Sequence, residues 1–235
     1  MNQSELLPDA QQLLETYRDA FLLGSTAPDL QTVSAQARAE THFFKLPYRD
    51  QALQPWEQLF FSYPELRSAW SLSPAQAAFM AGYLCHLQAD WLWILEIFLP
   101  NFEFKDGWVS YNKRIYYHNV LRAYMDTQIS QHLSKDVCYL LSKAVPEAWL
   151  PFAKDSHIIA WRNILTEQFI PGSTSKTVEV FAARQGVSPI AFYRLLNSEE
   201  LMEEHIFQYI PRQRLTAYQA LLISANLRLL RIWFA

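Results

Sequence analysis

Hydrophobic residues recur at helical spacing along almost the whole chain, whereas the two-residue alternation of half-buried strands is nearly absent. Only 5 of the 235 residues are glycine, which argues against a turn-rich all-β protein. The chain is long enough to bury a substantial core, and 51% of its residues are hydrophobic. We therefore predict an all-α fold, built as a multi-helix bundle.

Proline, glycine and polar capping residues divide this pattern into helical segments. Ser73, Pro74 and Gln76, for example, supply an N-cap, a first-turn proline and an N3 partner for the helix that follows them. The stretch PGSTSK, residues 171–176, is the clearest linker. We predict a helical domain over residues 1–170 and a C-terminal helical appendage over residues 171–235, which could equally be part of the same domain. The expected helices cover residues 8–23, 30–44, 55–63, 74–97, 112–133, 135–144, 151–169, 175–185, 189–204 and 211–234.

Charge and cysteine usage narrow the class of function. The net charge is −3 and no basic patch is evident, so we predict no binding to nucleic acid. Cys85 and Cys138 lie within expected helices and form no metal-type CxxC pair. We interpret them as buried free thiols in a reducing compartment.

Export and membrane signals are not evident in the sequence. The N-terminal stretch MNQSELLPDAQQ has neither the basic nor the apolar region of a secretion signal, so we expect a cytoplasmic protein. The longest apolar run, WLWILEIFLP, contains Glu96 and ends at Pro100, so it is too short for a transmembrane helix. We interpret the tail LRLLRIWFA as a terminal helix docked on the core, with a membrane-surface anchor as the alternative.

His86 and Asp90 stand one helical turn apart in the stretch AFMAGYLCHLQADWLWILE. Their spacing puts both side chains on one face of a helix, together with Phe79, Gly82 and Trp93. An imidazole and a carboxylate in apolar surroundings need a partner, and a metal ion satisfies both. A hydrogen-bonded His–Asp pair without metal is the alternative interpretation.

Two further candidate ligands lie upstream of this pair. Asp29 belongs to the stretch GSTAPD, which we expect to be a loop, and His42 belongs to THFF. With His86 and Asp90 they form a set of two histidines and two carboxylates that suits zinc. Each also has a simpler interpretation, because an Asp after proline is often only a helix N-cap and a histidine can be a satisfied core residue.

The stretches AFLLGSTAPD, THFF and AFMAGYLCHLQADWLW resemble successive signature segments of the zinc-dependent phospholipase C family, over roughly residues 10–135. The resemblance implies an all-α phosphodiesterase fold. It also implies that Asp29, His42, His86 and Asp90 hold the first zinc of a family site that uses three ions. In such a site zinc generates hydroxide for attack on a phosphorus centre.

The chain departs from the family pattern at the other zinc sites. It lacks the N-terminal Trp and the early His of the family, and Glu96 stands where the family has a third helix histidine. The later H-x-x-x-E pair reads His118 to Arg122, and a guanidinium cannot ligate a metal. We therefore expect one zinc, or a similar divalent ion. Arg122 could hold a substrate phosphate or pair with Asp126, and His118 could be a core residue.

These observations predict a metal-dependent hydrolase of the phosphoester or phosphodiester class that acts on a small substrate. Asp29, His42, His86 and Asp90 are the expected ligands, and His118 and Arg122 are expected to assist catalysis. The alternative is a catalytically inactive, phospholipase-C-like binding or scaffold protein. In that case a structural metal or a polar cluster only holds the helices together.

Overall fold

The computed structural model describes residues 6–47, 52–103, 110–130, 133, 136–170 and 177–235, and every regular element in these ranges is helical. The predicted all-α fold is therefore confirmed. The chain groups into two compact units, which alternate along the sequence. Unit 1 comprises residues 1–92, 136–170 and 221–235, and unit 2 comprises residues 93–135 and 171–220.

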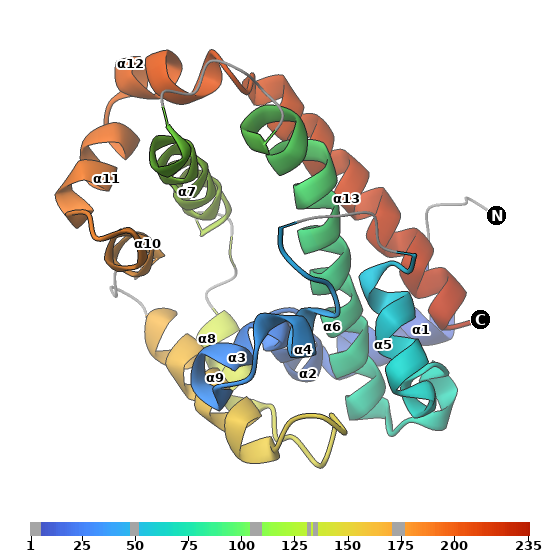
Figure 1. Ribbon diagram of the computed structural model, residues 1–235. Coiled ribbons are helices and arrows are strands. Elements are labelled where there is room, and N and C mark those ends of the chain that lie inside the picture. Colours follow the sequence, from blue (N-terminus) through green and yellow to red (C-terminus); the bar gives the residue numbers. More distant parts are fainter. Residues whose placement is uncertain (1–5, 48–51, 104–109, 131–132, 134–135, 171–176) are drawn as a thin grey trace. The chain divides into compact units, whose positions relative to one another are not determined.

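Unit 1 is built around the long helix α6 (Pro74–Trp93), with α5 and the end of α13 beside it in Figure 1. The other elements of this unit are α1 (Pro8–Thr16), α2 (Arg18–Gly24), η1 (Ala27–Leu30), α3 (Gln31–Ser34), α4 (Arg38–His42), α5 (Pro55–Ser62), η2 (Pro64–Leu66), η3 (Ala69–Ser71), α8 (Val137–Lys143), α9 (Asp155–Gln168) and the last part of α13 (Arg212–Trp233).

The first half of α6 is buried on all sides. Its consecutive residues 77–84 are all buried, and such a helix needs neighbours around its whole circumference. Ser73 caps the start as predicted, because its Oγ accepts a hydrogen bond from the backbone N–H of Gln76. The Gln76 side chain does not complete the capping box, since it donates to the carbonyl of Trp149.

Two glycines let α2 and α6 touch backbone to backbone. A Cβ atom added to Gly24 would lie 1.9 Å from the carbonyl oxygen of Phe79. A Cβ atom added to Gly82 would lie 2.2 Å from the carbonyl oxygen of Phe21 and 2.6 Å from the amide nitrogen of Ser25. Only glycine permits this approach, so both residues are required by the packing.

Unit 2 contains the π-helical segment η4 (Ile94–Glu103), α7 (Tyr111–Ser130), α10 (Thr177–Gln185), α11 (Pro189–Leu196), α12 (Glu199–Met202), the π-helical segment η5 (Glu203–Phe207) and the first part of α13. Within it, α7 packs against η4, α10 and α11, and the Tyr116 hydroxyl donates to the carbonyl of Ala191. The predicted linker 171–176 lies outside the described residues. A separate appendage over 171–235 stays a prediction, although residues 221–235 group with unit 1.

Three predicted segments differ from the observed helices. The expected helix 8–23 is broken at Tyr17, whose φ of −108° and ψ of 42° are not helical. The expected helix 30–44 is broken at Ala35, which has a left-handed φ of 60°, and the neighbouring Gln36 amide donates to the carbonyl of Phe152. The expected helix 189–204 is divided, and Ser198 caps the second part. At Ala35, the hydrogen bond from Gln36 to Phe152 outweighs the helical periodicity of the local sequence.

The helical path after α6 also continues further than predicted. We expected a loop from Phe98, yet the chain stays helical to Glu103 as wider π-helical turns. Pro100 lies inside this segment and has no N–H to donate to the helix. The guanidinium of Arg214 donates to the carbonyl of Glu96 in the same segment, at 3.1 and 3.3 Å.

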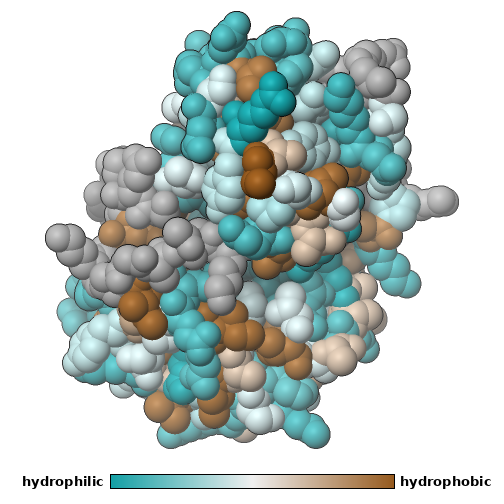
Figure 2. Space-filling model, turned by 90° about the vertical axis from the view of Figure 1, so that its left-hand side faces the viewer, coloured by the Kyte–Doolittle hydropathy of each residue, from teal (hydrophilic) through white to brown (hydrophobic). Residues whose placement is uncertain are grey.

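The helices expose a mixed surface. Figure 2 shows a face on which hydrophilic side chains predominate and hydrophobic ones form scattered patches. Among the described helices, none combines the length and the apolar character needed to cross a lipid bilayer.

We predict that Gly82→Ala lowers the free energy of unfolding by about 3 kcal/mol, because the new methyl group forces α2 away from α6. In an open helix the same change stabilises by up to about 1 kcal/mol, so the sign of the effect tests the contact. Urea unfolding measures it. The control is Gly186→Ala, which adds a methyl group where no atom lies within 4 Å and carries only the strain of a positive φ. A Gly82→Ala protein as stable as the parent contradicts the close approach.

Candidate metal centre

The second half of α6 presents His86 and Asp90 on one side, as predicted from their spacing. The nearest side-chain atoms, Nε2 of His86 and Oδ2 of Asp90, are 3.8 Å apart. The His86 side chain is 14% exposed and the Asp90 side chain is 31% exposed. The pair is therefore half-buried, with the imidazole on the inside.

Helix α4 brings His42 to the same place. Its start is stabilised by Glu40, whose carboxylate accepts the backbone N–H of Ala37 at 2.6 Å. The helix ends at Phe43, which adopts a left-handed φ of 60°. His42 is fully buried, and its Nε2 lies 3.5 Å from Oδ2 of Asp90. The rings of His42 and His86 meet edge to face, with centroids 5.4 Å apart.

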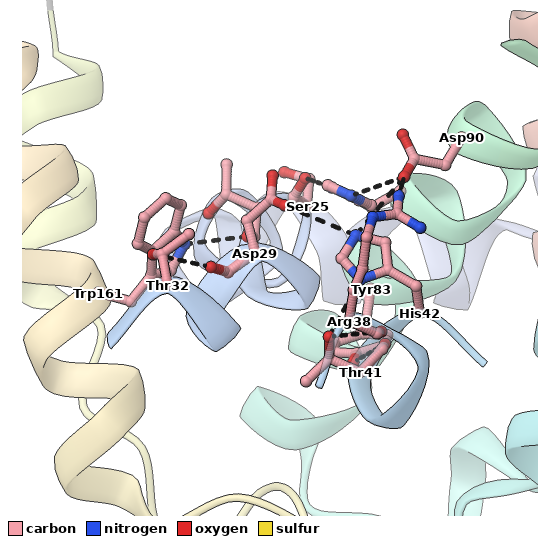
Figure 3. A network of polar contacts seen from close by, with 11 residues as sticks. Ser25, Asp29, Thr32, Arg38, Thr41, His42, Tyr83, Asp90 and Trp161 are labelled. Carbon is pink, nitrogen blue, oxygen red and sulfur yellow. Dashed lines mark hydrogen bonds and ion pairs between the residues drawn. The ribbon is translucent and has the colours of Figure 1, made fainter. Parts of the chain in front are cut away.

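The short helix η1 supplies Asp29, where we expected a loop. Oδ1 of Asp29 lies 3.5 Å from Nε2 of His42, and its side chain is 45% exposed. The turn before η1 is anchored by Trp161, whose indole N–H donates to the carbonyl of Thr26 at 2.9 Å. Figure 3 shows Asp29, His42 and Asp90 converging from three different elements. The structure thus brings all four predicted ligands together.

Hydrogen bonds fix the orientation and tautomer of both imidazoles. Nδ1 of His86 donates to the carbonyl of Ser25 at 2.9 Å, so Nε2 carries the lone pair when the ring is neutral. Nδ1 of His42 lies 3.0 Å from Oγ1 of Thr41, whose hydroxyl proton points to the carbonyl of Arg38. Nδ1 of His42 is therefore the donor in that pair, and its Nε2 also carries a lone pair.

Both Nε2 atoms are buried, and neither has a hydrogen-bond partner among the described residues. A buried polar atom without a partner is costly, so a missing group is expected there. Asp29, His42 and His86 each offer a ligand atom, and these atoms lie within 4.8 Å of one another. Ligands of a tetrahedral zinc with bonds of about 2.0–2.2 Å stand roughly 3.4 Å apart. The residues present therefore fit a zinc ion.

The charges of the cluster favour metal ligation at neutral pH. Burial lowers the pKa of His42, which keeps the imidazole neutral, although its contact with Asp29 works in the opposite direction. Burial alone raises the pKa of Asp29. The contact with His42, and the positive charges of His86, His42 and Arg38 at the acidic pH where this carboxyl titrates, outweigh burial and hold the pKa of Asp29 below its usual range. Neutral imidazoles and an ionised carboxylate are the protonation states that bind metal.

Arg38 distinguishes Asp90 from the other three residues. Its guanidinium forms an ion pair with Oδ2 of Asp90, the same oxygen that faces both histidines. The guanidinium also lies over the ring of Phe44, 4.7 Å from the centroid. Asp90 is therefore already neutralised by a fixed cation, whereas Asp29, which faces solvent on one side, is not ion-paired with arginine or lysine among the described residues.

His118 and Arg122 lie on α7 in unit 2, where they have local partners. The indole N–H of Trp93 donates to Nε2 of His118 at 2.8 Å, and the ring also contacts Phe98 and Phe102. Burial, together with Arg122, lowers the pKa of His118 well below its ordinary value. Arg122 is exposed and lies over the ring of Phe181. The catalytic roles expected of the two residues stay predictions.

Glu96, which stands at a family ligand position, pairs with the Arg214 side chain at 3.2 Å. Among the described residues, the only group of three or more metal-ligating side chains is the one that contains Asp29, His42 and His86. The expected number of one zinc ion stays a prediction.

Sequence reasoning missed the residues that support the ligands. Arg38 stands one helical turn before His42, an i, i+4 spacing that could have indicated a shared face. The roles of Ser25 and Thr41 rest on a carbonyl and a hydroxyl whose direction depends on packing. Tyr83 is likewise fully buried, and its hydroxyl donates to the carbonyl of Thr41.

Fold and site together define an all-α protein with a candidate zinc centre made of histidine and aspartate. The model of the family described as zinc dependent phospholipase C matches residues 1–136, more than half of the 235 residues. The chain belongs to the zinc-dependent phospholipase C family, as the signature segments predicted. Comparisons with curated proteins and with solved structures found no match. The family and the Asp29–His42–His86 cluster together support zinc binding and a hydrolase that acts on a lipid or another phosphoester.

We predict that the purified protein contains about one zinc ion per chain, and that His42→Ala and His86→Ala each abolish stoichiometric binding. Each change removes one of three converging ligands, and the energy of metal binding stabilises the fold. Elemental analysis measures the metal content, and thermal melting with and without a chelator measures the coupled stability. The control is His205→Ala, a histidine of unit 2 that stacks on Tyr117. A parent protein without metal, or variants that retain it, contradicts the assignment.

We further predict that the metal-free protein loses stability as the pH falls below about 6.5. The lowered pKa of His42 means that the unfolded chain binds more protons than the folded chain between that pKa and its ordinary value of 6.5. Asp29 adds a second loss below its ordinary pKa of 3.8, for the same reason. Urea unfolding in chelator at pH 5, 6 and 7 measures the first part. His42→Gln, which does not titrate, is expected to flatten that slope, and an unchanged slope argues against His42 as its source.

Proposed function

We propose that this protein is a single-zinc phosphoester hydrolase whose metal is held by Asp29, His42 and His86, with Asp90 as the fourth protein group. The observation that carries the proposal is the pair of buried, unpartnered Nε2 atoms that face Asp29. Zinc bound by such a set lowers the pKa of water toward about 7 and polarises a phosphoryl oxygen. Hydrolysis of a phosphate ester is the reaction that this chemistry and the family membership best support.

The residues around the candidate site suit this reaction. The histidines form the buried floor, while Asp29 and Asp90 are 45% and 31% exposed, so the site opens to solvent on the carboxylate side. A substrate can therefore approach from that side without rearrangement of the core. The Ser25 carbonyl and the Thr41 hydroxyl keep the imidazoles oriented during turnover.

Arg38 supports the proposal of one ion rather than several. A second cation beside Asp90 meets the positive charge of Arg38, which already neutralises that carboxylate. A guanidinium is also a good partner for phosphate oxygens, because its donors form a planar fork. We therefore propose Arg38, and not Arg122 of α7, as the cation that stabilises the charge of the phosphate.

The Arg38–Asp90 ion pair also supports the alternative of an inactive scaffold. An arginine, two aspartates and two histidines form a polar cluster that can hold α4, η1 and α6 together. In that case the zinc, or the ion pair alone, only stabilises the fold. Turnover separates the two functions.

We predict that Arg38→Met raises zinc affinity about tenfold but lowers turnover of a chromogenic aryl phosphodiester at least tenfold. The change removes a positive charge next to the metal and frees the Asp90 carboxylate, yet it also removes the cation for the substrate. Competition with a chelator measures affinity, and kcat/KM at equal zinc loading measures activity.

The matched control is Arg122→Met, which removes an exposed arginine of α7. We expect its zinc affinity and its kcat/KM to stay within about twofold of the parent. A larger loss of activity in Arg122→Met than in Arg38→Met supports the sequence-based role of Arg122 and refutes the role proposed for Arg38. Equal background rates in the parent and both variants support the scaffold.

A further inference from the structure

A groove of about 800 Å³ runs along unit 1 between α5 and the end of α13, over the second half of α6. We call it the α5–α13 groove. Its walls are mainly large apolar side chains, and these are Trp56, Phe60, Leu92, Leu229 and Trp233. Its volume lies in the range of about 300–1,000 Å³ that is typical of small-molecule sites.

The rim of the groove exposes hydrophobic side chains to solvent. Phe61 of α5 and Ile232 of α13 line it, and each is 71% exposed. An apolar surface of this kind is unfavourable in water, so a groove that contains it is expected to hold an apolar group.

Three polar groups in the groove have no partner in the described part of the chain. Gln88 is 7% exposed and lines the groove from α6, but its side-chain amide makes no hydrogen bond to any described residue. Arg67 and Arg228 also line it, and neither guanidinium lies within ion-pair distance of a described acidic group. Glu57, the acidic residue of the lining, already accepts the N–H of Gln54 at the start of α5.

The groove is separate from the candidate metal centre. Gln88 and Leu92 follow His86 and Asp90 by two positions each, which turns them by about 200° around the helix. The two sites thus occupy nearly opposite sides of α6. A ligand in the groove does not need the zinc.

We propose that the α5–α13 groove binds an amphiphile with one hydrocarbon chain and an anionic head group, either a carboxylate or a phosphate monoester. The chain packs along the aromatic and leucine walls. The head group pairs with Arg67 and Arg228, whose planar guanidinium groups match the geometry of both anions. The amide of Gln88, which lines the groove, donates to a polar atom of the ligand.

Calorimetric titration below the critical micelle concentration tests this site with three probes. Oleate and oleyl phosphate carry the two anionic head groups, and glycerol mono-oleate carries an oleoyl chain without charge. We expect saturable 1:1 binding of at least one anion, at least tenfold tighter than binding of the neutral ester. The tighter of the two anions then identifies the head group. Equal affinity for all three probes, or no saturable binding, overturns the proposal.

Variants separate the head-group and chain contacts. Arg67→Ala and Arg228→Ala are each expected to weaken binding of the anion about tenfold, the loss typical of a charge-assisted hydrogen bond. Ala225→Trp fills the groove from α13 and is expected to abolish binding while it leaves the arginines in place. The control is Arg184→Ala, an exposed arginine of α10 outside the groove. All variants are first compared by thermal melting and zinc content, which we expect to match the parent.

Binding to lipid vesicles is the competing outcome. If Arg67→Ala and Arg228→Ala weaken binding to anionic vesicles but the monomeric amphiphiles do not bind, the surface docks on a membrane and the groove is not a ligand site. If Ala225→Trp binds oleate as tightly as the parent, the ligand lies outside the groove. Either result contradicts the proposal.

Discussion

The contact between α2 and α6 is the constraint on which the candidate site depends. Gly24 and Gly82 bring the two backbones together, and this approach places the carbonyl of Ser25 against Nδ1 of His86. This carbonyl belongs to Ser25, the residue that caps the end of α2, and its hydrogen bond fixes the tautomer of His86. A helix contact one methyl group wider moves that carbonyl away from the imidazole. The packing of α2 on α6 and the orientation of His86 therefore depend on the same stretch of backbone.

The charges of the cluster are a second constraint on the candidate site. The lowered pKa of His42 keeps its imidazole neutral opposite an ionised Asp29, and the Nε2 atoms of His42 and His86 lack hydrogen-bond partners in the described chain. Arg38 neutralises Asp90 at the edge of the same cluster. One zinc ion more than offsets the net negative charge of Asp29, Asp90 and Arg38, and each additional cation adds further repulsion from Arg38. The proposal of a single zinc ion rests on this repulsion, because an arginine pairs with Asp90 but does not ligate metal.

The two sides of α6 are chemically different. One side carries the histidines and carboxylates of the candidate metal centre, and the other contributes Gln88 and Leu92 to the α5–α13 groove. A single buried helix thus separates a polar site from an apolar one within the same unit. Both sites lie on the second half of α6, where several side chains are only partly buried.

The sequence by itself determined the helical class, the long helix around His86 and Asp90, and the four candidate ligands. These features depend on periodicity and on residue type, which are local properties. It did not determine the breaks at Tyr17 and Ala35, because nothing in the local sequence resists continuing the helix there. Only the tertiary structure decided that Arg38 pairs with Asp90, that Ser25 and Thr41 orient the imidazoles, and that α5 and α13 leave a groove between them. The physical reason is that these contacts join residues on different elements, so their geometry exists only once the helices pack.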